Sequence, residues 1–171
     1  MIRKVLLAFV MASCVLGCSE HMSPQEYSHA WRQAVLDYRA IEKSPETAAA
    51  LAASGDPGGS RAAAIGGAAQ HISDQIREIA ARVKEFNPPP NMQPLQDETY
   101  SFYRGQADLF QGYASALGEG DSGKVDAAGD RVNLFVDEHQ KKVKDEITNL
   151  RNQSDQFQSA WLAVLKPIPR K

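Results

Sequence analysis

The sequence predicts an all-α protein: an up-down-up-down four-helix bundle with a long last helix, which follows a cleaved signal peptide. Apolar residues recur at alternating spacings of four and three over most of the chain, as on one face of a helix, and no stretch alternates with the period of two that a half-buried strand requires. Helix start and stop signals divide the chain into four long segments with short connections, which favours an antiparallel bundle.

The first helix is predicted to begin at Pro24. Ser23 offers an N-cap hydroxyl, Pro24 suits the first helical position, and Glu26 completes a capping box. The apolar residues that follow share one face: Tyr27, Trp31, Ala34, Tyr38 and Ile41. Ser44 and Pro45 repeat the start signal, so the chain either begins a second helix there or kinks the first.

A turn rich in Gly and Pro, at residues 55–60, separates this region from the next long helix. That helix has the most regular apolar pattern in the chain, and its members are Ile65, Ala69, Ile72, Ile76, Ile79, Val83 and Phe86. Asn87 and the three prolines after it end the helix, because proline cannot continue one.

The third helix is predicted over residues 95–117, and its apolar groups occupy two adjoining faces, which makes it the most buried of the set. Residues 118–123 break the chain again. The last segment runs without proline from residue 124 to 166 and spans roughly 60 Å if unbroken, with its likeliest bend at residues 152–155. In an up-down-up-down bundle, the end of this helix returns to the start of the first, so that Trp31 and Trp161 lie at the same end.

The chain begins with a short cationic stretch that includes Arg3 and Lys4, followed by an apolar run at residues 5–12. This order is typical of a secretory signal peptide, and the run is too short for a transmembrane helix, which needs roughly 20 apolar residues. The signal ends in Val15-Leu16-Gly17-Cys18, which resembles the lipobox of bacterial lipoproteins. Cys14 competes with Cys18, but a cut there shortens the apolar run.

The resemblance implies that residues 1–17 are removed and that Cys18 is acylated, with palmitate among its lipids. Residues 18–23 then form the tether, residues 24–166 a single domain, and residues 167–171 a tail. Ser19, rather than Asp, follows the cysteine, which in this family implies the periplasmic face of the outer membrane if the source is Gram-negative. The chain has 2 cysteines in all, so the mature protein keeps no free thiol and forms no internal disulfide.

Removal of the signal peptide takes away two basic residues and gives the mature chain a net charge of about −4, which offers no electrostatic basis for nucleic-acid binding. Residues 118–124 match the spacing of a phosphate-binding loop, G-x-x-x-x-G-K. However, Val125 occupies the position of the metal-binding hydroxyl, and a helix precedes the loop where a strand is required. We therefore read Gly118 as a helix C-cap and Asp121 or Ser122 as an N-cap, and expect no nucleotide.

Other catalytic and cofactor patterns are also incomplete. Glu26 and His29 form one E-x-x-H, whereas a di-iron bundle needs two, and Glu26 already has a capping role. The chain has no C-x-x-C-H for haem attachment and no G-x-S-x-G of a serine hydrolase. We therefore expect no metal, no cofactor and no enzymatic activity.

Aromatic residues of the third helix, with partners on other helices, form the remaining candidate site. His139 lies on the apolar stripe of the last helix, where a buried imidazole needs a hydrogen-bond partner such as a tyrosine hydroxyl. These side chains either line an apolar cleft or form ordinary core. The candidate cleft residues are Trp31, Tyr38, Tyr100, Tyr103, Phe110, Tyr113 and His139.

The sequence thus predicts a membrane-anchored envelope lipoprotein that acts as a non-enzymatic binding or structural protein for an envelope partner. Two alternatives stay open. One is a carrier of a small molecule or lipid, which uses the aromatic cleft. The other is an immunity-type lipoprotein that neutralises a toxin.

Overall fold

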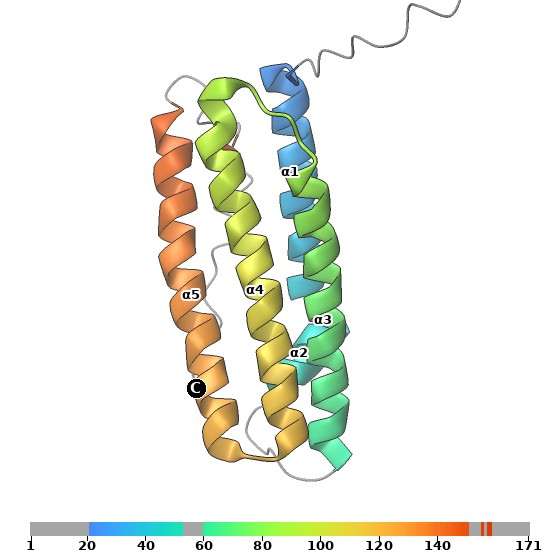
Figure 1. Cartoon of the computed structure of the whole chain (residues 1–171). Helices are drawn as coiled ribbons and strands as arrows, with labels where there is room; N and C mark the ends of the chain where they lie inside the picture. Colours follow the sequence, from blue (N-terminus) through green and yellow to red (C-terminus); the bar gives the residue numbers. More distant parts are fainter. Residues whose placement is uncertain (1–20, 53–59, 151–154, 156, 159–171) are drawn as a thin grey trace, which may run out of the picture.

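The computed structural model describes residues 21–52, 60–150, 155, 157 and 158. No strand occurs in these residues, and the prediction of an all-α protein is confirmed. The helices are α1 (Pro24–Glu42), α2 (Pro45–Ala52), α3 (Ser60–Lys84), the short 3-10 helix η1 (Pro90–Met92), α4 (Gln93–Glu119) and α5 (Ser122–Asn149) (Figure 1). The signal peptide with Cys14 and Cys18, the turn at residues 55–59, Trp161 and the tail lie outside the described residues.

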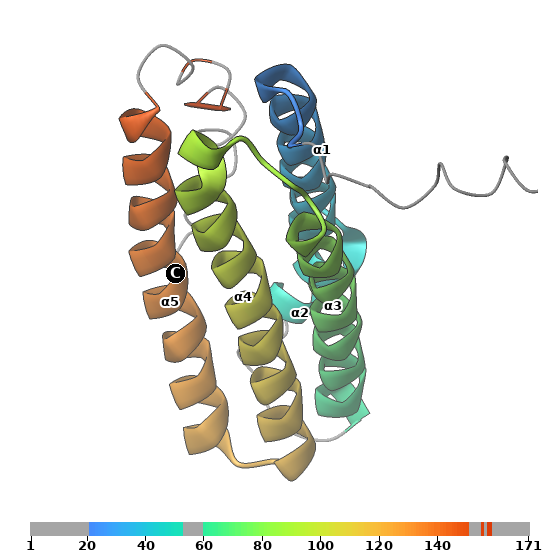
Figure 2. The same cartoon turned by 45° about the horizontal axis from the view of Figure 1, so that its top comes forward.

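The four long helices lie side by side with their axes nearly aligned (Figures 1 and 2). The backbone of α3 packs against α4 along most of its length, α5 packs against the other side of α4, and α1 packs against α3. Side chains of α1 also reach α4: the hydroxyl of Tyr27 donates to Gln96, and the ring of Tyr38 contacts that of Tyr103. Because both pairs advance together along the chain, α1 and α4 run in the same direction.

Contacts of α4 with its two neighbours run the opposite way. On α3, Val83 accepts a hydrogen bond from Gln96 near the start of α4, whereas Gly66 lies beside Leu117 near its end. Between α5 and α4, His139 in the second half of α5 pairs with Glu98 near the start of α4, and Lys124 at the start of α5 pairs with Glu119 at the end of α4. Late residues of one helix therefore lie opposite early residues of the other. Both α3 and α5 are therefore antiparallel to α4.

The N-terminus of α1 is stabilised by the predicted capping box. The backbone N–H of Glu26 donates to the Ser23 hydroxyl oxygen over 3.2 Å, and the carboxylate of Glu26 accepts from the Ser23 backbone N–H over 2.8 Å. Such a box satisfies two N–H groups that the first helical turn would otherwise leave unpaired. This start signal is confirmed.

The second start signal, at Ser44 and Pro45, begins a separate short helix rather than a kink. The Ser44 hydroxyl accepts from the Thr47 N–H over 3.2 Å, and the Thr47 hydroxyl donates to the carbonyl of Ile41 over 2.7 Å. These bonds turn the chain sharply between α1 and α2. The structure therefore has an additional helix beside the four long ones.

The predicted end of the third helix needs correction. Gly118 lies inside α4, and the C-cap is Gly120, which has the left-handed φ of 71°. Glycine adopts this conformation without the steric cost that a Cβ imposes, which explains why the helix ends there and not two residues earlier. Asp121 is the N-cap of α5, as predicted, and its carboxylate accepts from the Lys124 N–H over 3.1 Å.

The last helix is shorter than predicted, because α5 ends at Asn149 and Leu150 caps it. Residues 152–154 of the predicted bend lie outside the described residues. Phe157, beyond this bend, is helical and is fully buried against Tyr27 and Trp31 of α1. A straight continuation would carry Phe157 about 12 Å past the end of α5. Burial of its ring against α1 is worth about 2 kcal/mol, which favours the change of direction.

Candidate functional site

Three of the predicted cleft residues are buried in the core. Trp31, Tyr38 and Tyr103 are 0%, 2% and 0% exposed. The ring of Tyr38 lies 5.2 Å from that of Tyr103 and 5.7 Å from that of Phe102, which are the separations of packed aromatic pairs. These three side chains therefore belong to the core, which was the alternative interpretation of the aromatic pattern.

The remaining aromatic residues of the predicted cleft lie at the edge of the core. Tyr100, Phe110 and Tyr113 are half-buried and pack against buried neighbours. Burial raises the pKa of the Tyr113 hydroxyl, and the nearby carboxylate of Asp126 acts in the same direction. The hydroxyl of Tyr100 faces outward and accepts a long hydrogen bond of 3.4 Å from Arg104.

His139 has a hydrogen-bond partner, but the partner is a carboxylate and not a tyrosine. Its Nδ1 atom lies 2.5 Å from Oε1 of Glu98, and its ring rests on Phe135 at a centroid separation of 4.1 Å. The His139 and Glu98 side chains are 15% and 21% exposed. This pair joins α5 to α4. The rings of Phe135 and Phe102 connect it to the Tyr38–Tyr103 pair.

Buried polar side chains in α4 are the feature that sequence reasoning missed. Gln96, Thr99 and Gln106 are 3%, 0% and 4% exposed. The indole N–H of Trp31 donates to Thr99 over 2.9 Å, and the Tyr27 hydroxyl donates to Gln96 over 3.2 Å. A signal was present, because these polar positions continue the spacing of three and four set by their apolar neighbours.

A polar cluster lies where the end of α1 meets α4, and it consists of Tyr38, Glu42, Tyr103 and Gln106. The Tyr38 hydroxyl is hydrogen-bonded to both Glu42 and Gln106. Desolvation raises the pKa of the Glu42 carboxyl group to about 7, against the opposing effects of the Tyr38 hydrogen bond and of Arg39 and Lys43. The hydroxyl of Tyr103 and the Oε1 atom of Gln106 are buried without a hydrogen-bond partner.

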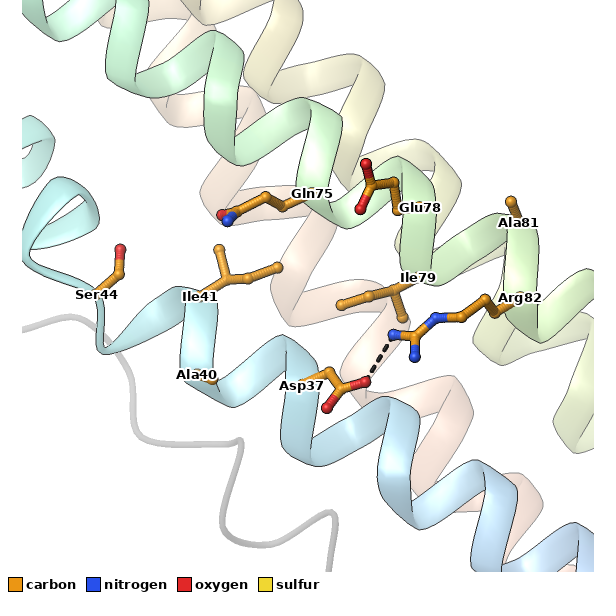
Figure 3. A pocket seen from close by; sticks show the side chains of 9 residues that line it. All are labelled: Asp37, Ala40, Ile41, Ser44, Gln75, Glu78, Ile79, Ala81 and Arg82. Carbon is orange, nitrogen blue, oxygen red and sulfur yellow. Dashed lines mark hydrogen bonds and ion pairs between the residues drawn. The ribbon is translucent and has the colours of Figure 1, made fainter.

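An open groove runs between α1 and α3, and we call it the α1–α3 groove (Figure 3). Its volume is about 770 Å³. Ile41 and Ile79 form its apolar floor, and polar side chains stand along its rim (Figure 3). The lining residues are Asp37, Ala40, Ile41, Ser44, Gln75, Glu78, Ile79, Ala81 and Arg82.

The charges at this groove are arranged asymmetrically. Arg82 donates to Asp37 across the two helices over 2.7 Å (Figure 3), whereas Glu78 carries a second carboxylate on the α3 side. Burial is the main reason why the pKa of the Tyr103 hydroxyl lies above its ordinary value. The charges of Glu42 and Asp37 raise this pKa further, and that of Arg82 lowers it. The α1–α3 groove is the candidate functional site, and the polar cluster lies beside it at the end of α1.

The arrangement of the other motif residues fits structural roles. Lys124, the lysine of the phosphate-loop spacing, pairs with Glu119 at 2.5 Å, and Gly118 is helical. Glu26 caps α1, and His29 is exposed on the same helix. Within the part of the chain that the structure describes, no three His, Cys, Asp or Glu side chains gather closely enough to hold a metal ion.

Comparison with known proteins gives no relative: no family model, curated protein or solved structure matches this chain. Among the described helices, none combines the length and the apolar character needed to cross a bilayer. The class that the fold and site define is therefore a helical protein with an aromatic core and an open interhelical groove.

Proposed function

We propose that this chain is a lipid-anchored protein of the bacterial envelope, whose helical body binds a protein partner without catalysing a reaction. The observation that carries the proposal is the sequence Val15-Leu16-Gly17-Cys18 after a cationic start and a short apolar run. Acylation at Cys18 would fix the mature chain to the membrane, because two or three acyl chains bind a bilayer firmly where one does not.

The beginning of the body supports a short tether. The Nδ1 atom of His21 lies 2.8 Å from the carbonyl oxygen of Pro88, and the Met22 N–H donates to Asn87 over 2.7 Å. These bonds attach the chain to the connection between α3 and α4. Since only residues 19 and 20 separate Cys18 from this attachment, the body would lie within about 10 Å of the lipid.

The α1–α3 groove is the proposed surface for the partner. It lies in the second half of α1, away from the end that carries His21, so the proposed membrane attachment leaves it accessible. Its apolar floor and charged rim resemble in composition the surfaces that proteins use for mutual recognition. A partner that presents a small apolar side chain and a basic group would complement Ile41, Ile79 and Glu78.

The directions of the helices support a finer description of the architecture. We propose an up-down-up-down bundle of α1, α3, α4 and α5, with α2 as an added short helix at the end of α1. In that arrangement the turn at Gly120 and Asp121 lies far from the lipid, roughly 40 Å along α4. This turn and the groove are the parts that could reach a partner beyond the membrane surface.

Acylation is tested by metabolic labelling with a palmitate analogue. We expect Cys18→Ala to abolish labelling and to release the protein from membranes, whereas Cys14→Ala keeps both. Labelling that survives Cys18→Ala and disappears with Cys14→Ala would place the lipid at the other cysteine, and labelling of neither form would contradict the anchor.

Partner binding is tested separately by envelope crosslinking from the groove. A photocrosslinking amino acid in place of Glu78 is expected to capture one envelope protein. The same group in place of exposed Gln111, which accepts a hydrogen bond from Arg77 between α3 and α4 and does not line the groove, is the control. Equal capture from both positions would contradict the groove. The carrier alternative has less support, because Trp31, Tyr38 and Tyr103 pack into the core. An immunity-type role predicts a toxin as the captured protein.

A further inference from the structure

Glu78, on the α3 side of the α1–α3 groove, has no counterion among the residues that the structure describes. Arg82 follows it by one turn on α3, and a Glu four positions before an Arg is the arrangement that favours an ion pair within a helix. Arg82 instead donates across the groove to Oδ2 of Asp37 on α1 over 2.7 Å (Figure 3). A pair between two helices therefore replaces the pair that the local sequence favours.

Asp37 is held in place to receive Arg82. Its Oδ1 atom accepts from the side-chain amide of Gln33, one turn earlier on α1, over 2.8 Å. Both carboxylate oxygens are thus engaged, and the charges of Asp37 and Arg82 compensate each other. The charge that remains at the groove is that of Glu78.

The nearby cations of the same two helices do not compensate Glu78. Arg77, the preceding residue on α3, is directed toward α4, where it donates to two side chains over 3.2 and 2.9 Å. On α1, Arg39 and Lys43 lie close enough to Glu42 to oppose the rise of its pKa, and neither lines the groove. In the described part of the chain, the α3 rim of the groove therefore carries an uncompensated negative charge.

An apolar surface lies next to this charge. Ile79, the next residue along α3, forms the floor of the groove together with Ile41 (Figure 3). On α1, Ala40 lines the groove, and Leu36, one turn earlier on the same face, is 41% exposed. Residues 37–44 of the lining extend over about 10 Å, a length that accommodates two neighbouring side chains of another protein.

We propose that Glu78 selects a cationic partner for the α1–α3 groove, and that the Asp37–Arg82 pair keeps Glu78 available. The partner presents a lysine or arginine that pairs with Glu78 and, beside it, an apolar side chain that contacts Leu36 and Ala40. Complementary charges at an interface serve mainly to choose the partner. Asp37 is a positioning residue, because it acts through Arg82. This inference rests on the proposed function, since it names the chemistry of the partner that the groove binds.

The test uses a photocrosslinking amino acid in place of Ala40, in the full chain in its own cell envelope, so that Glu78 can be varied. We expect Glu78→Lys to reduce capture of the partner about tenfold or more, because like charges across an interface repel each other. Glu78→Gln reduces it less. Glu85→Lys is the matched control and retains capture, because it makes the same change at an exposed residue that does not line the groove.

Three results would overturn a cationic protein partner. They are capture that Glu78→Lys leaves unchanged, an equal loss in Glu85→Lys, and crosslinks to lipid instead of protein. Mass spectrometry of the crosslinked peptide should find a lysine or arginine close to the captured position. Replacement of that residue by glutamate should restore capture by the Glu78→Lys chain, and a failure of this charge exchange would contradict the pairing.

A second set of variants tests the role of Asp37. Asp37→Asn releases Arg82, which can then pair with Glu78 within α3, and we expect capture to fall several-fold. Addition of Arg82→Gln removes the competing cation and should restore capture. A merely structural role of the ion pair predicts low capture in both forms, so capture that stays low in the double variant would overturn the positioning role.

The results also separate this inference from the proposed function. Capture from Ala40 that does not depend on the charge at residue 78 would leave the groove as a partner surface and overturn only its preference for a cation. Absence of capture from both Ala40 and Glu78 would contradict the groove as a partner surface, and the inference would fail with it.

Discussion

The Nδ1 atom of His139 on α5 lies 2.5 Å from Oε1 of Glu98 on α4, and the imidazole also rests on Phe135. Phe135 in turn packs against Gly105 on α4, where its Cζ atom occupies the space that a side chain would need. Two adjacent contacts, one polar and one steric, therefore set the register between α4 and α5. Each of them can be changed by a single substitution.

Removal of the carboxylate tests the polar contact. Glu98→Ala takes away the hydrogen-bond partner of a largely buried imidazole nitrogen, and we expect a loss of about 1 to 2 kcal/mol in the free energy of unfolding. Urea denaturation at neutral pH measures the loss. Glu138→Ala is the control, because Glu138 forms an exposed pair with Lys142 at 2.8 Å, which is worth under about 1 kcal/mol. Equal losses in the two variants would contradict a structural role for the His139–Glu98 pair.

The steric contact is tested by a pair of glycines on the same helix. A Cβ atom at residue 105 would lie 2.3 Å from Cζ of Phe135, so Gly105→Ala forces the ring to move and should destabilise the protein by about 1 to 3 kcal/mol. At Gly112 a Cβ meets nothing within 4 Å, so Gly112→Ala should stabilise the helix by about 0.5 to 1 kcal/mol. Thermal melts of both variants check the opposite signs. A melting temperature that Gly105→Ala leaves unchanged would show that the ring has room to move.

Much of this fold could be predicted from local signals. The capping box at Ser23 and Glu26 fixes the start of α1 by sequence-local hydrogen bonds, and the isoleucines of α3 mark its buried face by spacing alone. Pro45 and Asp121 likewise act within a few residues of their own positions. Features of this kind are visible in sequence because their causes are local.

The candidate site was predicted less well, because its causes are contacts between distant residues. Three rings of the predicted cleft, those of Trp31, Tyr38 and Tyr103, lie in the core. Gln96, Thr99 and Gln106 look like surface residues until α1 is placed beside α4, where Gln96 bonds to Tyr27 and Thr99 to Trp31. The α1–α3 groove depends on how closely Ile41 and Ile79 approach, which no spacing rule gives. The end of α5 depends on the burial of Phe157 against α1.

The turn between α4 and α5 gives a second matched pair of glycines. Gly120 has φ 71°, and an L-residue with a Cβ pays about 1 to 2 kcal/mol to adopt this conformation. Gly120→Ala should therefore lower the melting temperature, and Gly120→Asn should lower it less, because asparagine tolerates the left-handed region better. Gly118→Ala, inside α4 with open space around its Cβ, should raise the melting temperature slightly. If both alanine variants raised it, the left-handed cap would not be needed.

Glu42 in the polar cluster makes stability depend on pH in an unusual direction. Its pKa rises to about 7 in the folded protein from an ordinary value of 4.5, mainly because neighbouring groups partly desolvate the charged carboxylate, although the residue as a whole is exposed. Between these two pH values the folded state binds more protons than the unfolded state, so the contribution of Glu42 to stability falls as pH rises from about 4.5 to about 7. Glu42→Gln removes the ionisable group and should flatten this part of the pH profile, with higher stability than the parent above pH 7.

Glu46 is the matched control, because its shift has the opposite sign. It lies in the first turn of α2, where a backbone hydrogen bond and the Ser44 side chain lower its pKa. Glu46→Gln should therefore give no gain above pH 7, since the charged form of Glu46 is the favoured one. Melting temperatures of the parent and both variants, measured from pH 4 to pH 9, provide the test. A profile in which Glu42→Gln follows the parent at every pH would show that the carboxyl group of Glu42 is not desolvated by its neighbours.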